Sequence, residues 1–378
     1  MKVVFSMTAA LALSVSAWAA PEKVTVRVVS SQVVNDTITD AMSPTGLAVA
    51  PNGDILAAFQ DRGDIGPLCK AYIVRSTDGG KTWGAPEKVF AGKNDREGIS
   101  LTLHNAPDNS IYLTVTKMLH ASSDRKAVFG WRSSSIEIFR SVDGKEYTPV
   151  QKLPTPSGAI FSLTGKIIEL PNGDWVIPGY GYPKRARRAG EVYGAGIFRS
   201  TDKGKTWGSF ERIFKDDPAP GERPYSFNET DLLLKADGTL VAFARIDSRP
   251  RCHLWKVVSA DCGKTWSDPV ETNIPGLYPA IIRLDNGGFL MVASNRYAKP
   301  VIRTVNFFYS ADGENFTFAG MPYYTRTDGT PANSATGGLQ AVVKDPASGN
   351  YVVIFYAHDP ELPGHHQCYV DSNIVEVK

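Results

Sequence analysis

Cysteine and histidine are scarce in this sequence, with four cysteines and six histidines among 378 residues. No two cysteines are spaced as Cys-x-x-Cys, and the histidines form no His-Glu-x-x-His motif. These are the spacings that zinc sites commonly use, so their absence argues against a zinc site. We expect the protein to hold no metal and no other cofactor.

An excess of one charge and a long hydrophobic run in the body of the chain are also lacking. The 41 Lys and Arg residues nearly balance the 39 Asp and Glu residues, for a net charge of +2. Such a balance argues against a nucleic-acid partner. The one apolar run, Val3 to Ala17, follows Lys2 and ends at Ala17-Trp18-Ala19, which is typical of a cleavable signal peptide. We expect residues 1–20 to be removed and the protein to be secreted or periplasmic, without a membrane anchor.

One motif repeats along the chain. Ser76-Thr-Asp-Gly-Gly-Lys-Thr-Trp83 recurs as Ser200-Thr-Asp-Lys-Gly-Lys-Thr-Trp207 and as Ser259-Ala-Asp-Cys-Gly-Lys-Thr-Trp266, and degenerate copies begin at Ser141 and Ser310. Successive copies begin 51 to 65 residues apart. The Asp can accept N–H bonds of its own turn and the Trp can pack between sheets, so the motif predicts a structural turn.

A second repeated element is a turn between two β-rich runs, found once in each repeat. The six turns are Asn52-Gly53, Asp108-Asn109, Asn172-Gly173, Asp237-Gly238, Asn286-Gly287 and Ser348-Gly349. Asn-Gly and Asp-Gly between such runs mark tight hairpins. Each repeat therefore predicts a four-stranded antiparallel blade, and six repeats predict an all-β fold, a six-bladed β-propeller that forms a single domain over residues 21–378.

The ring is expected to close through its first strand. The alternating run from Lys23 to Val29 precedes the first blade and should supply the outer strand of the sixth. Cys69 and Cys368 should open the third strands of blades one and six, which are neighbours in a closed ring. We therefore predict a disulfide between them, and we expect a monomer.

The repeated turn, at this spacing, resembles the Asp box of the sialidase (neuraminidase) superfamily, and the similarity covers essentially the whole mature chain. The strongest local match runs from Asn228-Glu229 to Arg245. It looks like the sialidase segment that carries a catalytic glutamate and one arginine of a carboxylate-binding triad. The resemblance implies Glu229 as the partner base, Arg245 as a ligand clamp, and an exo-acting glycoside hydrolase for terminal sialic-acid-like or other acidic sugars of glycans.

The same resemblance suggests further site residues. Arg303 precedes its Asp box at the spacing of another triad arginine. The segment Ala58 to Asp64 resembles the region that holds a substrate-binding arginine, here Arg62, and the acid/base aspartate, here Asp64. Glu97 takes the place of a further pocket carboxylate. The ends of the second strands add three polar residues that should face a ligand: Asp61, Tyr182 and Arg296.

The sequence departs from the family pattern at two positions. Ser43 stands where the first triad arginine belongs. Thr336 or Gly337 stands where the tyrosine nucleophile of sialidases opens blade six. Tyr278 or Tyr182 is a candidate substitute for that tyrosine, and direct activation of water is the alternative.

Other functions and other roles remain open. A polysaccharide lyase on this scaffold would use a Tyr/His pair, for which Tyr180, Tyr182, Tyr356 and His358 are candidates. A propeller that binds glycans without chemistry is the third possibility. The structural alternatives are a salt-bridged edge carboxylate for Glu229, an internal ion pair for Arg245, and turn formation for Asp61 and Asp64.

Overall fold

The computed structural model describes residues 24–35, 37–38, 40–61, 66–123, 131–155, 159–182, 194–215, 225–247, 253–298, 302–326, 328–330, 336–359 and 368–378. All regular elements in these ranges are β-strands, and they form six antiparallel sheets. The described residues contain no helix that is long and apolar enough to cross a membrane.

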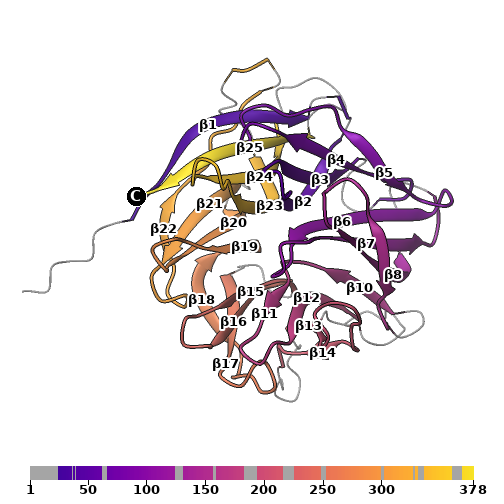
Figure 1. Cartoon of the computed structure of the whole chain (residues 1–378), viewed down its shortest axis with the longest axis vertical. Coiled ribbons are helices and arrows are strands. Elements are labelled where there is room, and N and C mark those ends of the chain that lie inside the picture. The colour runs from indigo at the N-terminus through magenta and orange to yellow at the C-terminus, as the bar shows by residue number, and fades with distance from the viewer. Residues whose placement is uncertain are drawn as a thin grey trace, which may run out of the picture.

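Figure 1 shows the six sheets arranged as blades around a central axis. Blade one contains β2 (Met42–Val49), β3 (Ile55–Gln60), β4 (Lys70–Ser76) and β5 (Glu87–Ala91). Blade two contains β6 (Glu97–Asn105), β7 (Ile111–His120), β8 (Trp131–Ser141) and β9 (Thr148–Lys152). Blade three contains β10 (Ile160–Leu163), β11 (Ile168–Glu169), β12 (Trp175–Tyr182), β13 (Gly194–Ser200) and β14 (Glu211–Arg212).

The second half of the ring follows the same plan, with the first strand of each blade nearest the axis. Blade four contains β15 (Phe227–Leu234), β16 (Leu240–Ile246), β17 (His253–Ser259) and β18 (Val270–Pro275). Blade five contains β19 (Leu277–Arg283), β20 (Phe289–Ala298), β21 (Ile302–Ser310) and β22 (Thr317–Gly320). Blade six contains β23 (Thr336–Lys344), β24 (Tyr351–His358), β25 (Cys368–Val377) and β1 (Val26–Asn35).

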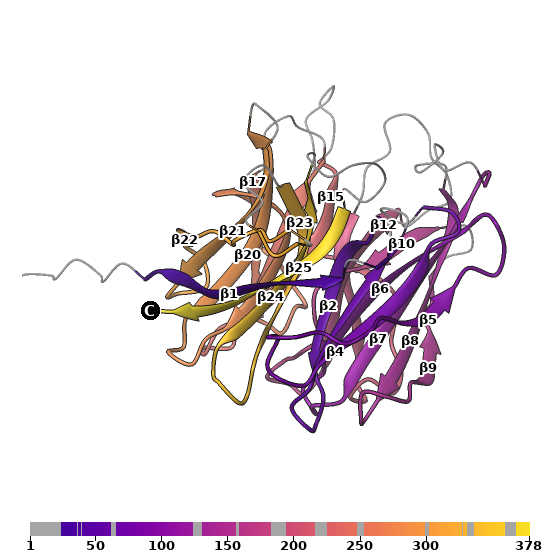
Figure 2. The ribbon, with the colours of Figure 1, turned by 90° about the horizontal axis from the view of Figure 1, so that it is seen from above.

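The two ends of the described chain close the ring. β1 pairs antiparallel with β25, from Val26 opposite Val377 to Asn35 opposite Val370. Figure 2 shows the two strands running together along the outside of the blade. The expected outer strand of blade six is therefore confirmed, and with it the six-bladed fold of four-stranded blades, in which the inner strand of blade three is divided into β10 and β11.

The hydrophobic core lies between blades rather than within one sheet. Six clusters of buried residues each join two neighbouring blades, such as Trp175 of blade three with Ile138 of blade two, and Phe227 of blade four with Phe214 of blade three. Because each sheet is covered on both faces, its strands are apolar in continuous runs rather than in strict alternation.

The Asp boxes are structural turns, as predicted. In the box of blade three, Asp202 Oδ1 accepts the Thr206 backbone N–H at 2.8 Å, and Oδ2 accepts the Thr206 hydroxyl at 2.7 Å. The hydroxyl bond and then the backbone bond of Thr206 lower the pKa of Asp202 to about 2. Trp207 is buried in the core between blades two and three. These carboxylates stabilise turns and lie at the opposite end of the blades from the strand entries.

Candidate active site

The innermost strands of four blades carry β-bulges close to the ends at which they enter their sheets. The register shifts fall between Met42 and Gly46 in β2, Phe227 and Thr230 in β15, Leu277 and Ala280 in β19, and Gly338 and Ala341 in β23. All four lie at the end of the ring opposite the hairpin turns and Asp boxes. Bulges bend the strand and redirect side chains, and they occur preferentially beside active sites.

Three of these bulges hold a non-glycine residue in the left-handed region. The φ angles are 52° at Ser43, 52° at Tyr278 and 48° at Leu339. Such a conformation costs about 1–3 kcal/mol for each residue and persists where the surrounding structure enforces it, often at functional sites. Repetition of this strain at one end of the ring marks that end as the candidate active site.

The fourth bulge, in β15, contains Glu229 within a cluster of charged side chains. Arg245 Nη1 donates to Glu229 Oε1 at 2.9 Å. The other terminal nitrogen, Nη2, donates to Asp247 Oδ1. The Asn228 amide donates to Asp247 Oδ2 at 2.8 Å. One guanidinium therefore bridges two carboxylates at the end of blade four.

This cluster is largely removed from solvent. The side chains of Arg245, Glu229 and Asp247 are 9%, 11% and 33% exposed. A buried guanidinium requires acids to offset the loss of its hydration. The internal ion pair expected as one role of Arg245 is confirmed, and its role as a ligand clamp stays a prediction. Sequence reasoning did not identify Asp247, although it follows Arg245 by two positions and thus continues the same face of the strand.

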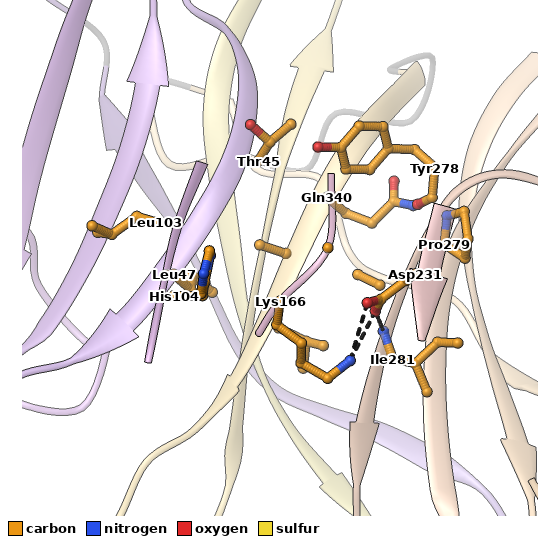
Figure 3. A pocket seen from close by; sticks show the side chains of 14 residues that line it. Thr45, Leu47, Leu103, His104, Lys166, Asp231, Tyr278, Pro279, Ile281 and Gln340 are labelled. Atoms are coloured by element: carbon orange, nitrogen blue, oxygen red, sulfur yellow. Dashed lines mark hydrogen bonds and ion pairs between the residues drawn. The ribbon is translucent and has the colours of Figure 1, made fainter. Parts of the chain in front are cut away.

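Tyr278 opens the neighbouring blade and lines the central channel. The channel contains a cavity of about 50 Å³, and Figure 3 shows Tyr278 and Thr45 at its walls, with Gln340 next to Tyr278. The Tyr278 carbonyl accepts a hydrogen bond from Gln340 Nε2, whose amide also donates to the carbonyl of Val292 at 3.1 Å. These bonds hold the strained backbone of Tyr278 in the blade adjacent to Glu229.

Farther along the channel an ion pair joins blades three and four. Lys166 Nζ lies 3.0 Å from Asp231 Oδ2 and donates to the Leu232 carbonyl at 3.0 Å. Asp231 also accepts the backbone N–H of Leu232 at 2.8 Å and that of Ile281 in blade five at 2.7 Å. Figure 3 shows this pair crossing the channel. It connects three blades directly beneath the candidate site.

The inner strand of blade three is interrupted to make room for this pair. Gly165, between β10 and β11, has a φ of 67°. A Cβ atom there would lie 2.6 Å from Asp231 Oδ1. Glycine is therefore required both by the backbone conformation and by the close approach of the Asp231 carboxylate.

His104 faces the same channel from blade two and supports a prediction about pH. It is 6% exposed, and neither ring nitrogen has a hydrogen-bond partner among the described residues. Burial, and then the charge of Lys166, lower the pKa of His104 to about 3. An unfolded histidine titrates near pH 6.5. Below that pH, His104 therefore binds a proton in the unfolded state but stays neutral in the folded state.

We expect the free energy of unfolding to fall by about 2 kcal/mol from pH 7 to pH 5 through this residue alone. Denaturant unfolding of wild type and of His104→Phe at both pH values measures the difference. The substitution should remove that share of the pH dependence. Equal pH dependence in the two proteins would show that His104 is not held neutral.

Two other predicted carboxylates shape loops. Asp61 Oδ1 accepts the backbone N–H of Lys70 at 2.6 Å, and Oδ2 accepts the Tyr72 hydroxyl at 3.3 Å. Glu97 Oε2 accepts the backbone N–H of Lys93 at 2.6 Å. These bonds give each carboxylate a structural task. The predicted roles of Asp61 in substrate binding and of Glu97 in catalysis stay predictions.

Several predicted site residues lie outside the described part of the chain. Arg62 and Asp64 belong to the segment 62–65, which the structure does not describe. Three others lie in strands β12, β20 and β21 but their side chains are outside the description: Tyr182, Arg296 and Arg303. The described side chains include no group of three or more His, Cys, Asp or Glu that is arranged to hold a metal ion.

The predicted cysteine pair lies in neighbouring blades. Cys69 is buried immediately before β4, and Cys368 is the first residue of β25, so each lies at the start of the third strand of its blade as expected. Tyr72 of β4 and Val370 of β25 pack in one core cluster between blades one and six. The Cys69–Cys368 disulfide stays a prediction.

Comparisons with known proteins agree with this architecture. A model of the BNR repeat-like domain family matches residues 72–317. The chain is similar in structure to a Dyadobacter fermentans protein of unknown function, with a TM-score of 0.72, 20% identity, and coverage of 94% of this chain and 100% of that one. No curated protein matches the sequence.

The structural relatives include enzymes, and two of them are similar to this chain over most of its length. The Hadza microbial sialidase Hz136 has a TM-score of 0.65 and 16% identity, covering 91% of this chain and 68% of that one. The GH93 α-L-arabinofuranosidase of Fusarium graminearum, in complex with arabinobiose, has a TM-score of 0.64 and 14% identity, covering 92% and 98%. Identities this low show a shared fold alone.

Proposed function

This chain belongs to the BNR repeat-like domain family, and from that premise we propose that it is a glycoside hydrolase that removes terminal sugars from glycans. The observation that carries the proposal is the bridged pair of acids, Glu229 and Asp247, at a bulged strand end facing the axis. Structural relatives with this fold include enzymes named as sialidases and arabinofuranosidases. We also propose export through residues 1–20 and action as a monomer.

The chemistry requires two groups on opposite sides of the scissile bond. One carboxyl donates a proton to the leaving glycosidic oxygen, and a second group attacks the anomeric carbon or activates water to do so. In sum, one water is consumed, the glycosidic bond breaks, and a free sugar and an alcohol are released. Glu229 is the proposed catalytic carboxylate, with Tyr278 in the adjoining blade and Asp64 in blade one as proposed partners.

The remaining predicted residues would hold the substrate. We propose substrate contacts for Arg62, Asp61, Tyr182, Arg296 and Arg303, which the sequence places at the same end of the blades. Their polar side chains suit the hydroxyl groups of a sugar. The class of reaction follows from the acids, and the charges around Arg245 determine which sugar is accepted.

A panel of substrates tests the proposal. The purified protein is incubated with sialosides, arabinan oligosaccharides, neutral aryl glycosides and uronate polymers, and products are followed by reducing-sugar release and by ultraviolet absorbance. Release of free sugar is expected. Absorbance of an unsaturated uronate would indicate a lyase, and binding without product would indicate a glycan-binding propeller; either result would contradict the proposal.

A further inference from the structure

The guanidinium of Arg245 has acids of its own blade at both terminal nitrogens. Glu229 Oε1 lies 2.9 Å from Nη1, and Asp247 accepts from Nη2. Recognition of a carboxylate by arginine commonly uses two parallel N–H bonds from one guanidinium. A carboxylate ligand that approaches these nitrogens would therefore come close to Glu229 and Asp247, each of which already accepts a bond from one of them.

Asp247 is fixed in this position by its own bonds. Its backbone N–H donates to the Ser226 carbonyl at 2.9 Å, which extends the pairing of β15 and β16 by one step. Its second carboxylate oxygen accepts from the Asn228 amide at 2.8 Å. The side chain is thus held from two directions beside Arg245, and displacing it would break several bonds at once.

The exposure of the three side chains and the net charge of the cluster also disfavour a carboxylate ligand. The Asp247 side chain is 33% exposed, whereas those of Glu229 and Arg245 are 11% and 9% exposed. A ligand from solvent therefore reaches a carboxylate before it reaches the arginine. Two acids against one arginine leave this cluster with one net negative charge, and like charges brought together in a partly buried site repel strongly.

We propose that Asp247 is a specificity-determining residue that closes Arg245 to carboxylate-bearing sugars and directs the site to neutral ones. The proposal rests on the proposed function for its reference to substrates. In a neutral sugar, hydroxyl groups donate to the partly exposed carboxylate of Asp247, and no second negative charge enters the cluster. The sialic-acid-like preference implied by resemblance would then not apply to this chain.

Binding measurements on Asp247→Asn test the proposal without requiring turnover. The probes are the methyl glycoside of N-acetylneuraminic acid and its methyl ester, which differ by one charge, together with arabinobiose. We expect wild type to bind the free acid no better than the ester. Asn keeps the shape of Asp but removes its charge, so the affinity for the free acid should rise about ten- to hundredfold, as expected for a new charge-assisted bond to Arg245.

Controls separate this role from a general effect of charge. Glu137→Gln also removes one negative charge, from a pair with Lys117 in blade two, and should leave the acid-to-ester ratio unchanged. Asp247→Ser is measured as a second variant, and thermal unfolding of each protein confirms that it is folded. A wild type that prefers the free acid, or the lack of any gain for the free acid in both Asp247 variants, would overturn the proposal.

The outcomes remain distinct from those of the substrate panel. If the protein is not a hydrolase, the panel yields no product, while the Asp247 variants still gain affinity for the free acid. If it is a hydrolase but Asp247 does not set specificity, product forms and the variants gain nothing. Release of sialic acid by wild type would contradict the specificity proposal and support the proposed reaction.

Discussion

Glu229→Gln is expected to lower turnover of the best substrate in the panel by at least about a hundredfold. Groups that transfer protons in the transition state contribute on the order of 10²–10⁴-fold to rate, and a glutamine of the same shape cannot transfer a proton. The amide oxygen can still accept from Arg245 Nη1, and Arg245 keeps its bond to Asp247. We therefore expect the melting temperature to fall only slightly.

The measurement is kcat and KM with the same substrate for both proteins, with thermal unfolding beside it. Glu137→Gln is the matched control, because Glu137 is also a carboxylate in an ion pair, with Lys117 at 2.6 Å, and has no proposed part in catalysis. A much smaller loss of turnover is expected there. Full activity in Glu229→Gln would remove Glu229 from the catalytic assignment, whatever the substrate.

The fold was predictable because the residues that form each turn and each hairpin are close together in the sequence. The Ser-x-Asp turn is completed within a few residues, as the bonds from Ser200 and Thr206 to Asp202 show. Hairpins such as Asn172-Gly173 are equally local, with Gly173 at a φ of 85°. The Ser-x-Asp turn occurs five times and the hairpin six times, and this repetition determines the number of blades.

The candidate site was predictable only in part, because its contacts join distant parts of the sequence. Glu229 and Arg245 were identified through resemblance to one continuous segment. The channel pair of Lys166 and Asp231 joins residues 65 positions apart, and no motif marks either of them. The solitary His104 likewise gains its low pKa only from burial and from Lys166.

Two further features escaped prediction for a different reason. The positive φ angles of Ser43 and Tyr278 are imposed by the bulges, since neither residue type favours that conformation. Asp247 was visible in the sequence two positions after Arg245, but its effect depends on the direction in which the guanidinium turns. Side-chain geometry of this kind follows from packing rather than from sequence pattern.

Asp231→Ala should cost about 3 kcal/mol of unfolding free energy, the largest loss of stability that we expect from one substitution. The Asp231 side chain is 3% exposed. It forms an ion pair with Lys166 and accepts hydrogen bonds from the backbone N–H groups of Leu232 and Ile281. Removing one partner of a buried pair typically costs about 3–5 kcal/mol. The lower end applies because the Lys166 side chain is 33% exposed and can turn toward water.

Asp285→Ala provides the comparison, since Asp285 pairs with Lys344 between blades five and six in the same way but at the surface. Its side chain is 74% exposed, and exposed pairs contribute little to stability. Urea unfolding of the three proteins at pH 7 should show a clear drop in midpoint for Asp231→Ala and almost none for Asp285→Ala. Equal midpoints for the two variants would mean that the channel pair does not hold blades three, four and five together.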